Sequence, residues 1–249
     1  MSDPARDREF PSPVRLPGEP TPPREPYETS HGDHIPVVVD DDADLYGAED
    51  AAARLAERLA RVEPGVARAG ADGRPLLSPP LTQGHDRIEG PAVGAVSLVV
   101  FGAHATPWSH ELGAVVAEVR ARHLATVGVA WRHYPDPAAH ARAGVLALAV
   151  EAAAGHGRFW ALTRELLLMR HHDPADLHAA MVRAGLEPAP VLEEMRAGAG
   201  SDRIVADVAS ALASGVVASP ALFIDGERYR GDLRPAPVLA ALEQAIAVR

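Results

Sequence analysis

From Pro91 onward the chain alternates between strand-like and helix-like segments, and this order limits the fold to an α/β or α+β layer architecture. Residues 96–101 and 126–134 are rich in β-branched and aromatic side chains, so we predict a strand in each. Between them, Thr106 is predicted to cap a helix whose first turn begins at Pro107. The buried stripe of this helix is predicted to comprise Leu112, Val115, Val116 and Val119. A strand, a helix and a strand in this order predict a right-handed crossover between parallel strands.

A helical insertion is predicted after the second strand, over about residues 137–200. Residues 137–154 and 157–170 are rich in helix-forming side chains. Asp173 and Pro174 then place a capping residue directly before a proline, which is typical of a helix start. The insertion therefore adds three helices to the strand-helix-strand unit.

The rest of the chain is predicted to return to the sheet. Apolar side chains at helical spacing predict a helix over residues 201–213. Two short strands, over residues 221–224 and 228–230, are separated by a turn that contains Asp225 and Gly226, a pair that favours a type I′ hairpin. A helix over residues 236–247 completes the predicted domain.

The residues before this domain differ in composition. The first 34 are rich in proline and charged side chains and lack apolar periodicity, so they predict disorder. The apolar run 35–39 is either a strand or only an apolar spot in the arm. Residues 48–62 predict a short amphipathic helix, and the proline- and glycine-rich residues 64–91 predict a linker. The predicted regions are a disordered arm over 1–34, an acidic region with the short helix and linker over 35–87, and a folded domain over 88–249.

Charge and apolar content restrict the partners. The chain has 34 acidic and 24 basic side chains, a net charge of -10, which argues against a nucleic-acid partner because phosphate binding needs a cationic face. Residues 1–26 contain no apolar core of a secretory signal peptide. No segment reaches the roughly 18 apolar residues of a membrane-spanning helix. We therefore expect a cytoplasmic protein without a membrane partner.

The sequence predicts no metal site and no cofactor. It contains 12 histidines, but His171 and His172 are adjacent and cannot both face one site from a regular helix, and no carboxylate lies at a convincing ligand spacing. His104 and His110 bracket the turn that contains Thr106 and Pro107, where they either contact a ligand or are exposed titrating side chains. No Ser-His-Asp signature, phosphate-binding glycine loop or paired carboxylate motif occurs.

Several short segments of the domain match a known family. They are Gly90-Pro91 and residues 97–102 (SLVVFG), 131–135 (WRHYP), 157–160 (GRFW) and 219–226 (SPALFIDG). In this order, over residues 88–247, the chain resembles the DsbA-family thiol oxidoreductases. The resemblance implies an α/β thioredoxin-like fold, with a central mixed β-sheet and an inserted helical domain.

The resemblance also implies where a C-x-x-C motif would stand. Those four positions hold Thr106, Pro107, Trp108 and Ser109, and the chain has no cysteine at all. A hydroxyl cannot form a disulfide, so the redox chemistry of the family is excluded. Thr106 and Ser109 either present hydroxyls to a ligand at a helix N-terminus or only cap that helix. Trp108 either stacks on a ligand or is simply an exposed aromatic side chain.

Ser219-Pro220 matches a dipeptide that faces the active site in this family. The resemblance implies a cis peptide bond there, and a backbone contact from the preceding residue to bound peptide or thiol. The leading hypothesis is a redox-inactive module that binds a peptide or protein in the groove beside Pro220. The residues predicted to bind it are Thr106, Pro107, Trp108, Ser109, Ser219, Pro220 and His104.

Two other functions remain open from the sequence. The chain also resembles the kappa-class glutathione transferases and hydroxychromene carboxylate isomerases, in which a Ser-Pro pair at the corresponding turn holds the thiol of a low-molecular-weight cofactor. Thr106 and Pro107 approximate that pair, which would make the hydroxyl of Thr106 or Ser109 the group that holds the thiol. The third hypothesis is a structural remnant whose acidic N-terminal region carries the function.

Overall fold

The computed structural model describes residues 43–249 except Pro64, Val66, 71–72, 93–94, Ala105 and 137–139, and it describes side chains from Ala48 onward. The predicted arm and the apolar run 35–39 lie outside the described residues.

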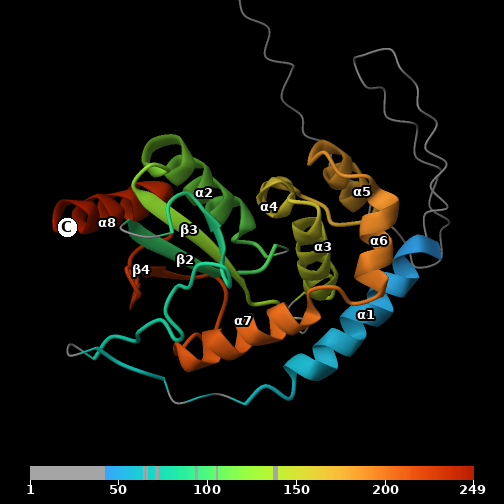
Figure 1. Ribbon diagram of the computed structural model, residues 1–249, viewed down its shortest axis with the longest axis horizontal. Coiled ribbons are helices and arrows are strands. Elements are labelled where there is room, and N and C mark those ends of the chain that lie inside the picture. Colours follow the sequence, from blue (N-terminus) through green and yellow to red (C-terminus); the bar gives the residue numbers. More distant parts are fainter. Residues whose placement is uncertain are drawn as a thin grey trace, which may run out of the picture. The chain divides into compact units, whose positions relative to one another are not determined.

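A five-stranded mixed sheet forms the centre of the described body (Figure 1). Its strands, in chain order, are β1 (Arg87–Glu89), β2 (Val96–Gly102), β3 (Val127–His133), β4 (Ala221–Ile224) and β5 (Glu227–Arg228). The spatial order is β1-β3-β2-β4-β5, and only β2 and β3 run parallel. The predicted parallel pair and mixed sheet are thus confirmed.

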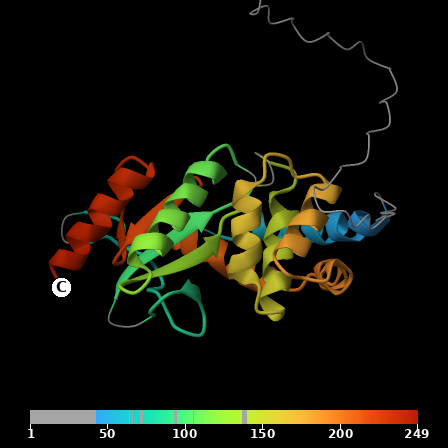
Figure 2. The same ribbon diagram turned by 90° about the horizontal axis from the view of Figure 1, so that it is seen from above.

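Eight helices accompany the sheet in the described part of the chain. They are α1 (Ala43–Leu59), α2 (Ser109–His123), α3 (Ala143–Gly155), α4 (Phe159–Leu168), α5 (Pro174–Arg183), α6 (Pro188–Arg196), α7 (Ser201–Ala213) and α8 (Pro235–Ala247). Helices α2 and α8 pack together on one face of the sheet, and α7 packs against β3. Helices α3 to α6 form the helical insertion, which lies beside the sheet and away from α8 (Figures 1 and 2).

Alternating side chains of β2 supply two cores, because successive residues of a strand point to opposite faces. Leu98 and Val100 belong to a large cluster with α2, α8 and the insertion. Val99 and Phe101 belong to a smaller cluster with Phe223, in which the Phe101 and Phe223 rings meet edge to face at 5.6 Å. The sheet is therefore covered on both faces.

Helix α1 belongs to the same body as the sheet and the insertion. Its Ala48, Ala51 and Leu55 are at most 2% exposed and lie in the large core cluster, and α1 packs against α3, α6 and α7. Leu77, from the predicted linker, is buried in the smaller cluster. The packed body therefore begins earlier than residue 88, where the composition change placed the domain boundary.

The first residue of α2 also differs from the prediction. The helix begins at Ser109 rather than at Pro107, and Trp108 occupies the N-cap position without a side-chain capping bond. Thr106 does not cap the helix, because its polar groups bond to Ser109 within the preceding turn.

Candidate ligand-binding site

The strand register brings two separate segments to one end of the sheet. In β2, Phe101 pairs with Ala221 of β4 and Gly102 pairs with His133 of β3. The turn that follows β2 and the Ser219-Pro220 segment that precedes β4 therefore lie at the end of the sheet where β2 and β3 end. Ligand sites of open α/β sheets are commonly found beyond the carboxyl ends of parallel strands. The peptide bond between Ser219 and Pro220 is cis in the structure.

Hydrogen bonds within the turn use the hydroxyl of Ser109. This side chain is 2% exposed. Its Oγ accepts a hydrogen bond from the Thr106 N–H at 3.0 Å, donates to the His104 carbonyl at 2.8 Å and lies 3.2 Å from Thr106 Oγ1. The Ser109 N–H donates to the Thr106 carbonyl at 3.0 Å. Ser109 is thus a structural element of the turn, whereas the half-buried Thr106 keeps part of its surface open.

Pro107 and Trp108 form the exposed tip of the turn. Pro107 is exposed, and 52% of the surface of Trp108 is open to solvent. Large aromatic side chains are usually buried in the absence of a partner, because their transfer from water is favourable. Trp108 is therefore the residue of this turn best placed to contact a ligand.

His104 lies inside the body rather than on the ligand-facing surface. It is 1% exposed, and its ring stacks on the Trp131 indole with the centroids 4.7 Å apart. Neither ring nitrogen has a hydrogen-bond partner among the described residues. Burial, with a smaller contribution from the charge of His133, lowers the pKa of His104 well below its ordinary value of 6.5. The backbone carbonyl of His104 thus accepts a hydrogen bond within the turn, whereas its ring is part of the buried core.

Gly102 makes room for the Trp131 ring under the turn. A Cβ atom at position 102 would lie 2.5 Å from Cη2 of Trp131, which is closer than carbon atoms can approach. The glycine therefore lets the indole reach His104.

A buried polar network continues from His133 into the helices, and sequence reasoning missed it. His133 Nε2 lies 3.1 Å from Glu151 Oε1, and Arg87 pairs with the other carboxylate oxygen of Glu151 at 2.7 Å. The His133 N–H donates to Asp207 Oδ2 at 2.9 Å, and Arg203 pairs with Oδ1 of the same carboxylate at 3.0 Å. The end of β3 is thereby bonded to α3 and α7. The partners are far apart in the sequence, so no local sequence pattern indicates the network.

Glu151 should make folding stability depend on acid pH. Burial raises its pKa, but hydrogen bonds and charge from His133 and Arg87 outweigh burial and lower it from 4.5 to about 2. A carboxyl with a lowered folded-state pKa stabilises the fold above the unfolded value and loses this contribution as pH falls. The shift corresponds to about 3 kcal/mol, at 1.36 kcal/mol per unit. We expect the free energy of unfolding to fall between about pH 4.5 and pH 2.

Chemical denaturation at a series of pH values tests this expectation. Glu151→Gln should be less stable at neutral pH and should flatten the dependence between pH 4.5 and 2. Glu118→Gln is the control, because Glu118 is 39% exposed and its ion pair is with Arg122, one helical turn away, so it should keep the wild-type slope. An unchanged slope in Glu151→Gln would contradict the assignment.

The described residues contain no group of three or more histidine or acidic side chains that could hold a metal ion. Within the same residues, no helix is long and apolar enough to cross a membrane.

Solved structures with a similar backbone are thioredoxin-like oxidoreductases. A thioredoxin-like oxidoreductase from Silicibacter pomeroyi DSS-3 aligns over 65% of this chain and 92% of its own, with a TM-score of 0.57 and 18% identity. BdbD from Bacillus subtilis aligns over 74% and 100%, with a TM-score of 0.58 and 11% identity. Wolbachia pipientis alpha-DsbA1 aligns over 68% and 94%, with a TM-score of 0.58 and 13% identity.

The chain has a DsbA-like thioredoxin fold. Its sheet, its inserted helices and the Ser219-Pro220 segment before β4 fit this fold. Its turn after β2 carries hydroxyls, on Thr106 and Ser109, at the two positions that match the cysteines of a C-x-x-C motif. Because this DsbA-like domain contains no cysteine, it cannot exchange disulfides through its own side chains.

The sequence comparisons give a different set of names. No family model matches the chain. The chain is 32% identical over 169 residues to the Na(+)/H(+) antiporter NhaA 1 of Mycolicibacterium gilvum, a match that covers 66% of this chain and 27% of that protein. It is 32% identical over 198 residues to NhaA 3 of Salinispora tropica, covering 78% and 30%. The chain spans less than a third of the length of these curated relatives, so the likeness concerns one part of each.

Proposed function

We propose that this DsbA-like domain binds an extended segment of another polypeptide at the end of the sheet formed by the turn residues 106–109 and by residues 219–221, without redox chemistry. The observation that carries the proposal is the pairing of Phe101 with Ala221, because it brings both segments to the same end of the sheet. Two exposed apolar side chains belong to these segments or adjoin them, Trp108 at 52% and Val217 at 87% exposure. These two side chains offer a ligand apolar contacts.

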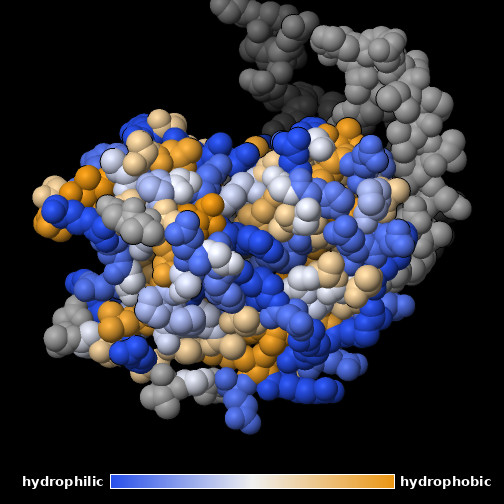
Figure 3. All heavy atoms as spheres, viewed as in Figure 1, coloured by the Kyte–Doolittle hydropathy of each residue, from blue (hydrophilic) through white to orange (hydrophobic). Residues whose placement is uncertain are grey.

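Among the described residues, the side of β4 that faces away from β2 is open only at its first residue. The short β5 pairs with Phe223 and Ile224, the Tyr229 backbone N–H donates to the Leu222 carbonyl, and Ala221 pairs with β2 on the other side. An extended peptide can add to such an edge through main-chain hydrogen bonds, with side chains supplying specificity. On the face shown in Figure 3, hydrophobic residues lie in small groups among hydrophilic ones, so a strand edge supports the proposal better than one broad apolar surface.

The geometry gives the alternative enzyme function no comparable support. A hydroxyl that holds a low-molecular-weight thiol must be free to donate to it, whereas Ser109 is buried and already donates to the His104 carbonyl. The N–H of Thr106 is also engaged, by the Ser109 hydroxyl. Polypeptide binding requires neither group.

An array of overlapping peptides, probed with the full chain, tests the proposal. Peptides retained by the wild type should bind about tenfold more weakly to Trp108→Ala and to Val217→Asp, because a buried anchor at an interface is worth about 1–2 kcal/mol. Val248→Asp is a matched control, since Val248 is an equally exposed valine, at 85%, beyond the end of α8. The proposal fails if no peptide binds above background, or if the two site variants bind as the wild type and Val248→Asp do.

A further inference from the structure

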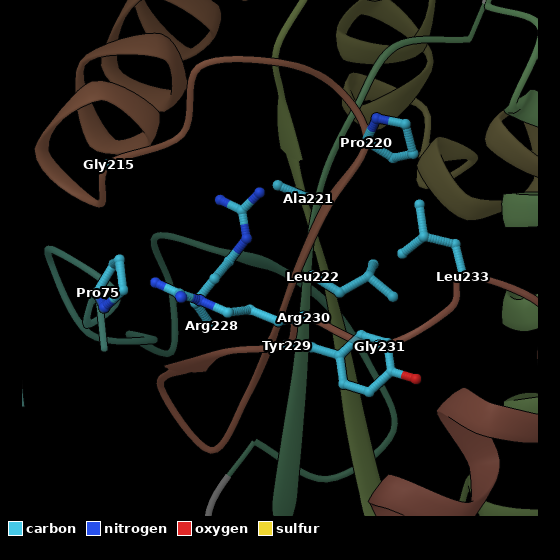
Figure 4. A pocket seen from close by; sticks show the side chains of 10 residues that line it. All are labelled: Pro75, Gly215, Pro220, Ala221, Leu222, Arg228, Tyr229, Arg230, Gly231 and Leu233. Atoms are coloured by element: carbon cyan, nitrogen blue, oxygen red, sulfur yellow. The ribbon is translucent and has the colours of Figure 1, made fainter. Parts of the chain in front are cut away.

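A cavity of about 390 Å³ opens on the strand edge directly beside Pro220 (Figure 4). Its apolar wall includes Pro75, Leu222 and Leu233. Arg228 and Arg230 also line it, and both side chains lie on the side of β4 where Pro75 and Gly215 lie, whereas the Tyr229 ring lies on the other side. The cavity therefore combines an apolar wall with two guanidinium groups.

Neither arginine has an acidic partner among the described residues. The nearest acidic side chains in sequence are engaged elsewhere: Glu227 pairs with Arg74 at 3.5 Å and Asp232 pairs with Arg234 at 2.7 Å. In a chain with 34 acidic and 24 basic side chains, most arginines can find a carboxylate. Two adjacent cations without one, at the wall of a cavity, indicate a place for an anion.

Two contacts hold Arg228 at the wall of the cavity, where it is partly buried and close to the charge of Arg230. Its backbone N–H donates to the Pro75 carbonyl at 3.1 Å, and its guanidinium lies over the Phe223 ring, 5.4 Å from the centroid. Burial, and then the charge of Arg230, lower the pKa of Arg228 below its ordinary value. A bound anion would offset both the cost of desolvating Arg228 and the repulsion between the two cations.

We infer that this cavity binds a carboxylate of the ligand, so that the strand edge selects polypeptide segments with acidic side chains. The inference rests on the polypeptide-binding function proposed above. A guanidinium group donates paired N–H hydrogen bonds to the two oxygens of a carboxylate, which gives the contact its geometry. The apolar wall accommodates the side chain next to the acidic residue. A free dicarboxylate shares this chemistry and is the alternative source of the anion.

Calorimetric titration with two synthetic hexapeptides tests the inference. The acidic probe is acetyl-Ala-Val-Glu-Val-Glu-Ala-amide, and the neutral probe has glutamine in place of both glutamates. The acidic probe should bind roughly tenfold more tightly, the expected value of a charge-assisted hydrogen bond. Arg228→Gln with Arg230→Gln should abolish the difference, and Arg230→Gln alone, at an exposed residue, should reduce it. Arg234→Gln removes the same charge from an exposed pair and should keep the difference.

The outcomes separate this inference from the proposed function. Equal affinity for the two peptides, or a preference that survives loss of both arginines, overturns the selection of carboxylates and leaves polypeptide binding in place. If neither peptide binds but glutarate binds in a way that requires Arg228 and Arg230, the carboxylate site stands with a free acid as its ligand and the polypeptide function fails. If neither peptide nor glutarate binds, both are wrong.

Discussion

The double variant Thr106→Cys/Ser109→Cys should form an intramolecular disulfide under a mild oxidant. The two hydroxyl oxygens lie 3.2 Å apart, and sulfurs on the same Cβ atoms need only a small rotation to reach the bonding distance of about 2.05 Å. The sulfur at position 106 should be the reactive one, because Thr106 is half-buried whereas Ser109 is 2% exposed. Its position just before α2 should lower the pKa of this thiol below about 8.5.

Thiol titration before and after oxidation, with mass spectrometry of the monomer, measures the result. Each single variant is a control that keeps one thiol and cannot close a bond within the chain. The wild type should show no disulfide reduction or oxidation, because it has no cysteine. Two thiols that stay free in the oxidised double variant would show that the turn lacks the geometry described here.

Asp86→Ala should lower the free energy of unfolding by about 3–5 kcal/mol, the usual cost of removing one partner of a buried ion pair. Asp86 accepts from Arg132 through both oxygens, at 2.8 and 3.0 Å, and the Arg132 side chain is 1% exposed. Burial raises the pKa of Asp86, but Arg132 and a hydrogen bond from Thr82 outweigh it and lower the pKa. Without the carboxylate, the buried guanidinium keeps Ser210 and main-chain carbonyls as partners but no opposite charge in direct contact.

Denaturant unfolding compares this variant with Asp202→Ala. Asp202 forms an equally short pair with Arg58, at 2.6 Å, but its side chain is 96% exposed, so its loss should change stability by about 0–1 kcal/mol. A fragment of residues 88–249, which lacks α1, Leu77 and Asp86, should not reach the stability of the full chain. A loss below about 1 kcal/mol in Asp86→Ala would show that the buried pair with Arg132 contributes little to the stability of the fold.

The elements that the sequence predicts well are those with local causes. Asp225 and Gly226 both adopt positive φ, 48° and 83°, as a type I′ turn requires, and the helix over 201–213 has the predicted bounds. Asp173 accepts from the Asp176 N–H and caps α5, as its position before Pro174 indicates. In each case a few neighbouring residues decide the conformation.

The features that the sequence does not reveal depend on contacts between distant residues. Helix α1 has an amphipathic pattern, but nothing in that pattern says that Ala48 and Leu55 pack in the same core as α3 and α6. Strand β1 has only three residues, too few for a periodicity to appear. In the site, local reasoning gave Thr106 the role of a cap, whereas the long-range network of His133 and Glu151 gave no signal at all.

Thr106 and Ser109 place oxygen rather than sulfur in the turn, which determines how the proposed site responds to the redox state of its surroundings. A turn with two cysteines exists in an oxidised and a reduced form, and the balance between them follows the reduction potential of the compartment. With oxygen at both positions, the turn has one covalent state only. The turn therefore cannot change covalently with the redox state, and we expect ligand affinity to be the same in oxidising and reducing surroundings.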